Sequence, residues 1–210
     1  MKEGDIRFLK LLILVNGAVP LALLIWDQAH NRLGANPQNF LILTTGMMTL
    51  VFLMLTMAVT PLRKVTGWNW LIQIRRMLGL YAFFYGCLHF LCFFSLDRGF
   101  NISSTLTEMV KRKYLIIGSI ALLIMVPLAF TSTNAMIKWM GGKRWRALHR
   151  LAYVAAICGA IHYYMQAKAD VRQPLVFAAV LAVLLGWRLV DYWQLPKPAP
   201  APVAKPKPEI

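Results

Sequence analysis

Two of the four histidines occupy positions where an ionisable side chain is energetically expensive. His89 and His162 each lie well inside a long apolar segment, and His149 stands at the beginning of one. An ionisable residue inside such a segment marks a functional site by default, with a neutral histidine hydrogen-bonded between helices as the alternative. His30 falls in a polar stretch, where we interpret it as a solvated loop residue.

A matching stripe of small residues precedes each of these two histidines. The positions three, seven and ten residues earlier hold Gly86, Ala82 and Gly79 before His89, and Gly159, Ala155 and Ala152 before His162. Steps of three and four residues keep side chains on one helix face. Small residues allow close helix packing, but a flat macrocycle between two helices needs the same cleared surface. The pattern favours a haem iron ligated by two imidazoles.

His89 and His162 are also expected to lie at one depth. His89 follows Arg76 by 13 residues and His162 follows His149 by 13, a rise of about 20 Å in an α-helix. Arg76 and His149 then share a second level. Because 13 residues leave ideal helical positions roughly 140° apart, His149 and His162 can face one cleft only if the helix is irregular, for example near Gly159.

The second level holds one histidine, so a second haem there would need another kind of ligand. Arginine stays protonated and is a poor ligand, but it pairs well with haem propionates or a flavin phosphate. We therefore expect His149 to serve an inner cofactor whose anionic groups are held by Arg75, Arg76 or Arg144. The tryptophans near this level are typical of an interfacial belt, with flavin contact as the alternative: Trp68, Trp70, Trp139 and Trp145.

Six apolar segments must position these residues. Hydrophobic residues make up 59% of the 210-residue chain and charged residues only 15%, against about 25% in soluble domains. Each segment has roughly the 20 residues that cross a bilayer, and none alternates with period two as in a barrel. We predict an all-α, six-span membrane bundle over residues 1–194, with an uncleaved first helix. The spans are about 8–26, 40–59, 77–96, 114–131, 148–165 and 174–192.

The net charge of +15 sits in short clusters between the apolar segments. This distribution indicates membrane orientation rather than nucleic-acid binding. Sixteen of the 23 lysines and arginines fall on one side, so that side and both termini are predicted to be cytoplasmic; the cluster 111–113 runs against the pattern. Residues 195–210 are proline-rich and predict a disordered cytoplasmic tail that touches at most anionic lipid.

Other kinds of site find little support in the sequence. The three cysteines lie in apolar segments without a CxxC pair, so we interpret them as core residues. No Walker loop, GxGxxG or nucleophile elbow occurs, so nicotinamide is not expected to bind here. Two alternatives stay open. One is a haem enzyme acting directly on quinone or ferric iron, and the other is a cofactor-free transporter or scaffold.

Several short motifs, taken in order, resemble one known family. These are LGANP (33–37), TPLR (60–63), RRMLGL (75–80), LAFTST (128–133), GKRWRALHRLAY (142–153) and IHYY (161–164). Together with His89 they resemble the MsrQ (YedZ) family, the haem-binding membrane subunits of the bacterial periplasmic methionine sulfoxide reductase system. That family belongs to the ferric reductase-like transmembrane proteins. The resemblance covers about residues 8–192.

The resemblance implies a six-helix bundle in the bacterial inner membrane that carries electrons and does no substrate chemistry itself. Electrons would come from a cytosolic NAD(P)H flavin reductase, pass through FMN and haem b, and leave to a periplasmic molybdopterin-containing methionine sulfoxide reductase subunit. The family's haem histidines carry over onto His89, His149 and His162. Oxidase relatives have a second histidine on the third helix where this chain has Arg76, a departure that favours a flavin at the inner level.

Overall fold

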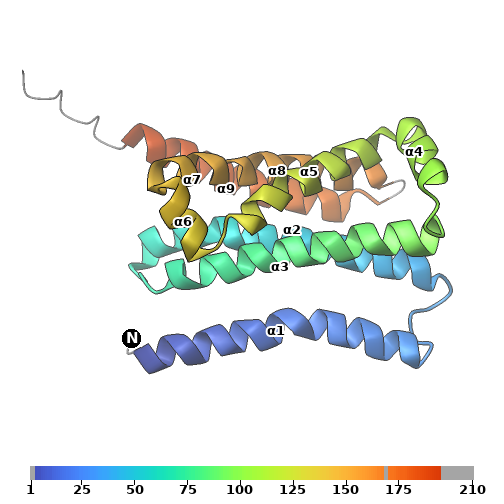
Figure 1. Cartoon of the computed structure of the whole chain (residues 1–210), viewed down its shortest axis with the longest axis horizontal. Coiled ribbons are helices and arrows are strands. Elements are labelled where there is room, and N and C mark those ends of the chain that lie inside the picture. Colours follow the sequence, from blue (N-terminus) through green and yellow to red (C-terminus); the bar gives the residue numbers. More distant parts are fainter. Residues whose placement is uncertain (1–2, 168–169, 195–210) are drawn as a thin grey trace, which may run out of the picture.

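Long helices lying side by side form the architecture. The structure, a computed structural model, describes residues 3–167 and 170–194; the predicted disordered tail falls outside them. No strand occurs among the described residues, so the all-α prediction is confirmed. Figure 1 shows α4 at one end of the bundle and α6 and α7 at the other, called here the α4 end and the α7 end. The elements are α1 (Glu3–Ala29), α2 (Pro37–Thr66), α3 (Leu71–Cys92) with a π-helical extension η1 (Phe93–Asp97), α4 (Ile102–Lys111), α5 (Lys113–Phe130), α6 (Asn134–Met140), α7 (Gly142–His149), α8 (Leu151–Gln166) and α9 (Arg172–Gln194).

Helix α2 shows how local signals set these boundaries. The Asn36 side chain accepts a hydrogen bond from the Asn39 N–H at 3.1 Å, and Pro37 occupies the first turn, where its missing N–H costs nothing. Gly67 ends the helix at φ +73°, and its N–H donates to the carbonyl of Arg63. A left-handed residue at this position is ordinarily glycine, because only glycine adopts it without strain.

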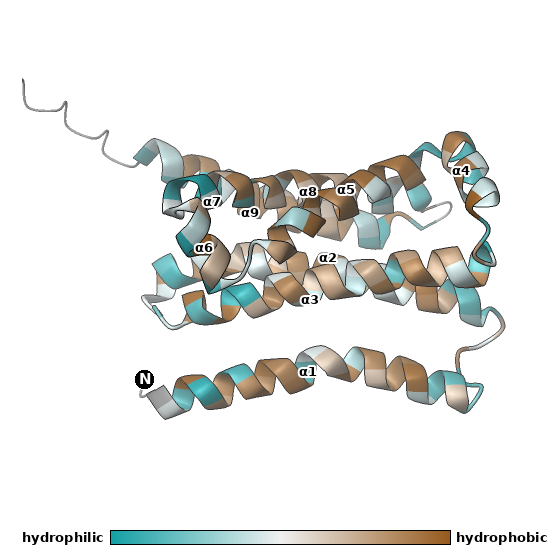
Figure 2. Ribbon diagram, in the orientation of Figure 1, coloured by the Kyte–Doolittle hydropathy of each residue, from teal (hydrophilic) through white to brown (hydrophobic). Residues whose placement is uncertain are grey.

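Five helices are long and apolar enough to cross a membrane, judged by length and composition among the described residues. They are Gly4–Ala29, Pro37–Thr66, Leu71–Asp97, Lys113–Phe130 and Arg172–Gln194. Figure 2 shows hydrophobic residues along these helices and hydrophilic residues gathered toward the two ends. Helix α8, the predicted fifth span, has 16 residues, fewer than the about 20 that cross the hydrocarbon. The count of six spans therefore stays a prediction.

The bundle is built from two closely packed helix pairs. Helix α2 makes its main contact with α3, and α5 makes its main contact with α8, while α9 packs on α8 and α2. Small side chains lie where the helices approach most closely, and Ala82, Ala155 and Ala156 are fully buried. Small residues allow the dispersion contacts that hold helices together in lipid. The three cysteines are free, but Cys87 is exposed and Cys92 and Cys158 are only partly buried, so their interpretation as core residues was wrong.

Helix α1 is attached to α3 through two tyrosines. The hydroxyl of Tyr85, which is fully buried, donates to the Gly17 carbonyl at 2.8 Å and accepts from the Leu21 N–H at 3.2 Å. A regular helix would join these two backbone groups directly, and Pro20 interrupts the helix beside them. The Tyr81 hydroxyl donates to the Leu14 carbonyl, and its ring fills the space that a Cβ on Gly17 would need.

Replacing Tyr85 by Phe should therefore weaken the attachment of α1. The variant removes the hydroxyl that bridges the Leu21 N–H and the Gly17 carbonyl, and an unsatisfied buried polar group costs about 1–3 kcal/mol. We expect Tyr85→Phe to lower the thermal unfolding midpoint of the purified full-length protein. Tyr192→Phe, at a tyrosine that is 73% exposed, is the control and should unfold like the wild type. Equal midpoints for all three proteins would contradict this role of Tyr85.

Candidate functional site

A cavity of about 280 Å³ separates the two helix pairs. Its wall runs from Leu53 and Met125 in mid-bundle to Asp97 and Arg112 at the α4 end, and it includes both His89 and His162. The cavity lining is apolar in mid-bundle, and its charged residues lie at the α4 end. The two histidines predicted to act together from sequence therefore meet in one cavity.

The two imidazoles are held in the same way by different helices. The ring centroids lie 5.9 Å apart, and the ring planes stand at 83°. Nδ1 of His89 is 2.8 Å from the Ile42 carbonyl of α2, and Nδ1 of His162 is 2.7 Å from the Tyr114 carbonyl of α5. Each helix pair thus supplies one histidine and the backbone acceptor that fixes its ring.

These hydrogen bonds decide which nitrogen of each imidazole carries the proton and which keeps an unshared lone pair. A backbone carbonyl only accepts, so each Nδ1 must carry the proton and donate it. In a neutral imidazole the Nε2 atom then keeps its lone pair, which is the arrangement found in metal-ligating histidines. Among the described residues neither Nε2 makes a hydrogen bond. Both histidines are consequently prepared to ligate through Nε2.

A glycine one turn after each carbonyl lets the ring approach the helix. A Cβ on Gly46 would lie 2.9 Å from Nδ1 of His89, and a Cβ on Gly118 would lie 2.6 Å from Nδ1 of His162. Contacts this close between non-bonded atoms are repulsive, so any larger residue would displace the ring. Ile42 and Gly46 of α2 thus correspond to Tyr114 and Gly118 of α5.

The correspondence between the two helix pairs extends one turn further. A Cβ on Gly86 of α3 would lie 3.2 Å from Leu122 of α5, and a Cβ on Gly159 of α8 would lie 3.0 Å from Leu50 of α2. Leu50 follows Gly46 by one turn, as Leu122 follows Gly118. All four residues also line the cavity. Of the small stripes predicted from sequence, Gly86, Ala155 and Gly159 border the cavity, whereas Gly79, Ala82 and Ala152 do not line it.

The donor set fits an iron porphyrin better than a bare metal ion. No group of three or more His, Cys, Asp or Glu capable of holding a metal occurs among residues 3–167 and 170–194. Two imidazoles alone leave most coordination positions of a bare ion empty, whereas a porphyrin supplies four nitrogens to its iron. His89 and His162, whose ring centroids lie 5.9 Å apart, would hold the iron of such a group, which would supply one-electron chemistry.

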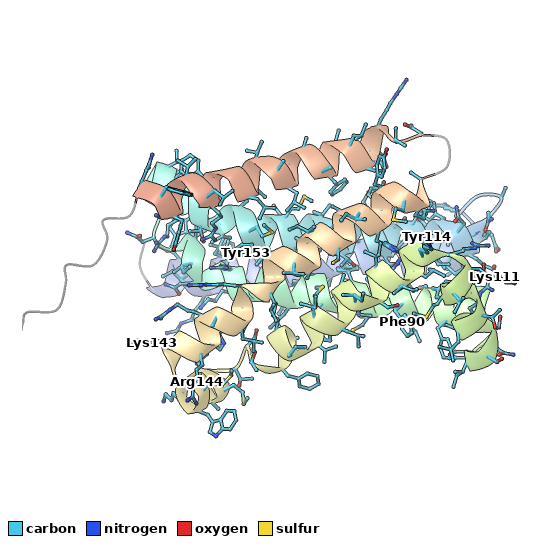
Figure 3. All side chains as sticks on the ribbon, turned by 90° about the horizontal axis from the view of Figure 1, so that it is seen from above. Phe90, Lys111, Tyr114, Lys143, Arg144 and Tyr153 are labelled. Carbon is cyan, nitrogen blue, oxygen red and sulfur yellow. The ribbon has the colours of Figure 1, made fainter. Side chains whose placement is uncertain are left out.

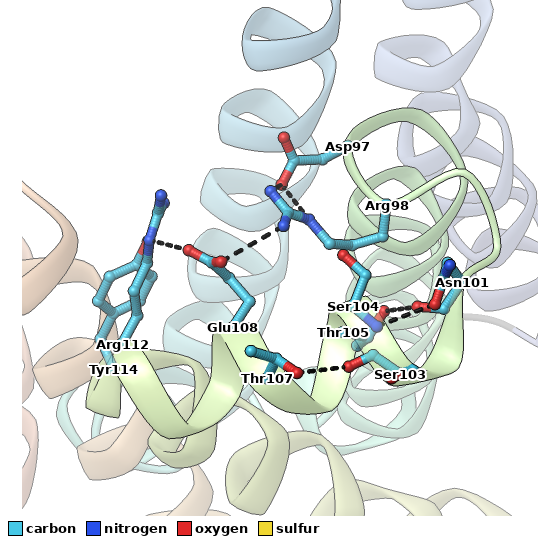
Figure 4. Close-up of polar contacts among 10 residues, drawn as sticks. All are labelled: Asp97, Arg98, Asn101, Ser103, Ser104, Thr105, Thr107, Glu108, Arg112 and Tyr114. Atoms are coloured by element: carbon cyan, nitrogen blue, oxygen red, sulfur yellow. Dashed lines mark hydrogen bonds and ion pairs between the residues drawn. The ribbon is translucent and has the colours of Figure 1, made fainter.

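Charged side chains form an ion-pair chain at the α4 end of the cavity. Arg98 pairs with Asp97 at 2.6 Å and with Glu108 at 3.4 Å, and Glu108 also pairs with Arg112 (Figure 4). Nη1 of Arg112 lies 3.3 Å from the hydroxyl of Tyr114, the residue whose carbonyl orients His162. Arg112 is the cation of the cavity wall among the described residues. It is the residue suited to pair with haem propionates.

The α7 end brings together a second group of predicted residues. His149 stacks on Trp145, with centroids 3.9 Å apart, and its Nδ1 lies 3.1 Å from the Trp145 carbonyl. The charges of Arg75 and Arg76 both act on this histidine, which places the two arginines beside it. Nε2 of His149 is buried without a partner. Arg76 also donates to the Asn134 side chain at 2.7 Å.

The helix irregularity expected between His149 and His162 lies at a different residue from the one suggested. Helix α7 ends at His149 and α8 begins at Leu151, so the break falls at Arg150 rather than near Gly159. Tight turn hydrogen bonds, from Arg150 N to Ala147 O and from Tyr153 N to Arg150 O, mark it. His149 does not line the cavity that contains His162, so the two histidines do not share that cleft.

Other predicted residues lie apart from these two groups. Arg144 is exposed on α7, and Figure 3 shows it at the edge of the bundle, away from Tyr153 of α8. Trp68 and Trp70 stack on each other, and Trp139 is 80% exposed, as an interfacial belt would be. His30 is exposed and stacks on Trp26. The interpretation of His30 as a surface residue is confirmed.

Sequence reasoning missed the partners that orient the histidines. Ile42 and Tyr114 act through backbone carbonyls, which no side-chain pattern reveals. Gly46 and Gly118 did carry a signal, because a glycine inside an apolar helix costs about 1 kcal/mol relative to alanine and usually has a packing reason.

Comparison with known proteins agrees with this geometry. Residues 42–160 match the family described as ferric reductase like transmembrane component. The protein-methionine-sulfoxide reductase heme-binding subunit MsrQ of Ralstonia nicotianae is 47% identical over 90% of this chain and 88% of its own length. The MsrQ subunits of Herminiimonas arsenicoxydans (46%; 90% and 88%) and Rhodospirillum rubrum (44%; 90% and 91%) are similarly close. The chain therefore belongs to the MsrQ family of ferric reductase-like transmembrane components.

Proposed function

We propose that this chain carries electrons across a bacterial inner membrane through a haem b held by His89 and His162. The observation that supports this proposal best is the pair of imidazoles 5.9 Å apart, each fixed through Nδ1 to a backbone carbonyl. The haem supplies one-electron chemistry, while the protein sets its position and potential. The haem-binding function in the printed names of the relatives supports the same assignment.

The inner cofactor of this proposal is FMN, bound at the α7 end. His149 offers a buried Nε2 without a partner, and Arg75 and Arg76 lie beside it with charges suited to a phosphate. Arg144, exposed on α7, would meet an anion arriving from solution rather than one within the bundle. In this arrangement both termini are cytoplasmic.

The relatives are named as heme-binding subunits of a protein-methionine-sulfoxide reductase, which supports a role for this chain within such a system. A cytosolic NAD(P)H flavin reductase would deliver electrons, and a periplasmic molybdopterin-containing subunit would use them to reduce methionine sulfoxide in proteins. The chain then needs no substrate site of its own. Membrane lipid surrounds the apolar helices.

Changing His89 or His162 to alanine tests the haem assignment. Because each supplies one axial nitrogen, we expect either variant to lose the low-spin haem absorption of the purified wild type while still inserting into the membrane. His30→Ala removes an exposed histidine and is the matched control, which should keep the full spectrum.

The rival functions predict other results. Full haem retention in both variants would refute the assignment, and a colourless wild type purified with haem supplied would favour a transporter or scaffold. Rapid reduction of quinone or ferric iron by the purified protein alone would favour a direct haem reductase.

Replacing Gly118 by Ala tests whether ring placement depends on the glycine. A Cβ there would lie 2.6 Å from Nδ1 of His162, so the ring must move and its bond to the Tyr114 carbonyl must break. We expect the haem content to fall at least severalfold. Gly186→Ala, where a Cβ meets nothing within 4 Å, should keep the haem content and gain up to about 1 kcal/mol of stability. Equal haem content in the two variants would contradict the role of Gly118.

Arg112→Gln tests the polarity of the cavity mouth. Removing a cation near the haem favours the more positive oxidised iron, so we expect the midpoint potential to fall by on the order of tens of millivolts. Lys111→Gln removes the same charge from the neighbouring residue, which does not line the cavity, and should shift the potential less. Spectroscopic redox titration of both variants measures the difference, and equal shifts would count against a direct role for Arg112.

A further inference from the structure

The α7 end holds buried polar atoms that nothing in the described structure satisfies. Within residues 3–167 and 170–194, four buried side-chain atoms lack a hydrogen-bond partner: Thr60 Oγ1, His149 Nε2, and Nε and Nη2 of Arg188. All belong to the α7 end, because α2 and α9 finish there and His149 ends α7 itself. Two of the four belong to one arginine of the last helix.

Arg188 and Arg75 belong to the same end of the bundle, and the positive charge of Arg188 acts unfavourably on that of Arg75. The ring of Tyr153 and Leu184 of α9 pack against the hydrophobic cluster that contains Ile74, the neighbour of Arg75 in α3. The guanidinium carbon of Arg188 is 5.6 Å from the centroid of that ring. Helices α3, α8 and α9 thus converge on this point with one residue each.

The carboxylate of the same helix that could neutralise Arg188 is already used. Asp191, one turn further along α9, pairs with Lys64 of α2. Three further ion pairs lie at the α4 end and involve Arg98 and Arg112. Arg75 and Arg188 take part in no ion pair within the part of the chain that the structure describes.

Arg75 and Arg188 are half-buried, and two guanidinium groups without a carboxylate partner are unfavourable there unless a ligand compensates their charge. A buried charge is tolerated when it is paired and hydrogen-bonded, and like charges add to the cost. Water can satisfy an N–H donor but cannot neutralise the charge. An oxyanion does both, because arginine forms bidentate, charge-assisted hydrogen bonds with phosphate and carboxylate.

We propose that Arg75 and Arg188 jointly bind one oxyanion group, a phosphate or a carboxylate, between α3 and α9. The proposal deepens the proposed function: it assigns to the inner site a residue of α9, a helix outside the family-matched segment 42–160. Arg188 is the basic residue within the predicted last span, an unusual position for a charge that has no role. The oxyanion has three possible sources, namely the phosphate of FMN, a propionate of an inner haem, or an anionic phospholipid headgroup.

The test compares Arg188→Gln, Arg188→Lys and wild type, all full length and in lipid nanodiscs. Arg172→Gln is the matched control, because it removes an exposed arginine from the opposite end of the same helix. Each protein is titrated with FMN and with riboflavin, which lacks the phosphate. In parallel, haem per chain is counted, and phosphatidylglycerol retained by the purified protein is measured by native mass spectrometry. The spectrum of the His89–His162 haem reports correct folding in every sample.

If FMN supplies the oxyanion, Arg188→Gln should weaken FMN binding about 10–100-fold, as expected for a lost hydrogen bond to a charged group, and leave riboflavin binding unchanged. Arg188→Lys should recover part of the affinity. If an inner haem supplies it, Arg188→Gln should lose one haem per chain, and if lipid supplies it, retained phosphatidylglycerol should fall. Arg172→Gln should match the wild type in all three measurements.

Three results separate this proposal from the proposed function. Unchanged FMN affinity, haem count and retained phosphatidylglycerol in Arg188→Gln would overturn the Arg75–Arg188 site, whatever wild type binds. Wild-type protein that binds no FMN but loses haem or phosphatidylglycerol on substitution would support the site and refute FMN as the inner cofactor. If the purified wild type showed no haem absorption at all, the proposed electron path through a haem at His89 and His162 would be refuted instead.

Discussion

The structure depends on two hydrogen bonds from imidazole to helix backbone. A helical carbonyl that already accepts from the residue one turn later still has a second lone pair, and His89 and His162 each use one, at Ile42 and Tyr114. The donor must come very close to the helix axis to reach it. That requirement explains the glycines at 46 and 118, because a Cβ at either position would occupy the space of the ring.

The same requirement makes the bundle a repeat of one unit. In the first unit, α2 presents the Ile42 carbonyl, Gly46 and Leu50 at successive turns and packs against α3, which carries Gly86 and His89. In the second unit, α5 presents the Tyr114 carbonyl, Gly118 and Leu122 and packs against α8, which carries Gly159 and His162. The leucine of each unit meets the glycine of the other, Leu50 at Gly159 and Leu122 at Gly86. Interlocking of this kind fixes the separation of the helix pairs, and therefore the separation of the two imidazoles.

The two ends of the bundle handle charge in opposite ways. At the α4 end, positive and negative side chains alternate from Asp97 to Arg112, so the mouth of the cavity is nearly neutral and its hydrogen bonds are satisfied (Figure 4). At the α7 end, Arg75 and Arg188 repel each other and polar atoms stay unpaired. A protein tolerates such a deficit where function requires it. The contrast supports an oxyanion ligand at the α7 end, whereas the haem is placed by His89 and His162.

The sequence by itself determined the long helices and the pairing of His89 with His162. Apolar length sets where a chain can be helical in lipid, and equal spacing from polar residues sets equal depth, so both are encoded along one dimension. The tertiary structure decided what depends on contact between distant segments. Examples are the carbonyls that orient the imidazole rings and the bond from the Tyr85 hydroxyl of α3 to the backbone of α1. The helix break at Arg150 and the effect of Arg188 on Arg75 are two more. Backbone acceptors are the same at every residue, and a repulsion between two arginines exists only once the fold brings them to the same end of the bundle. For that reason no pattern in the sequence announces them.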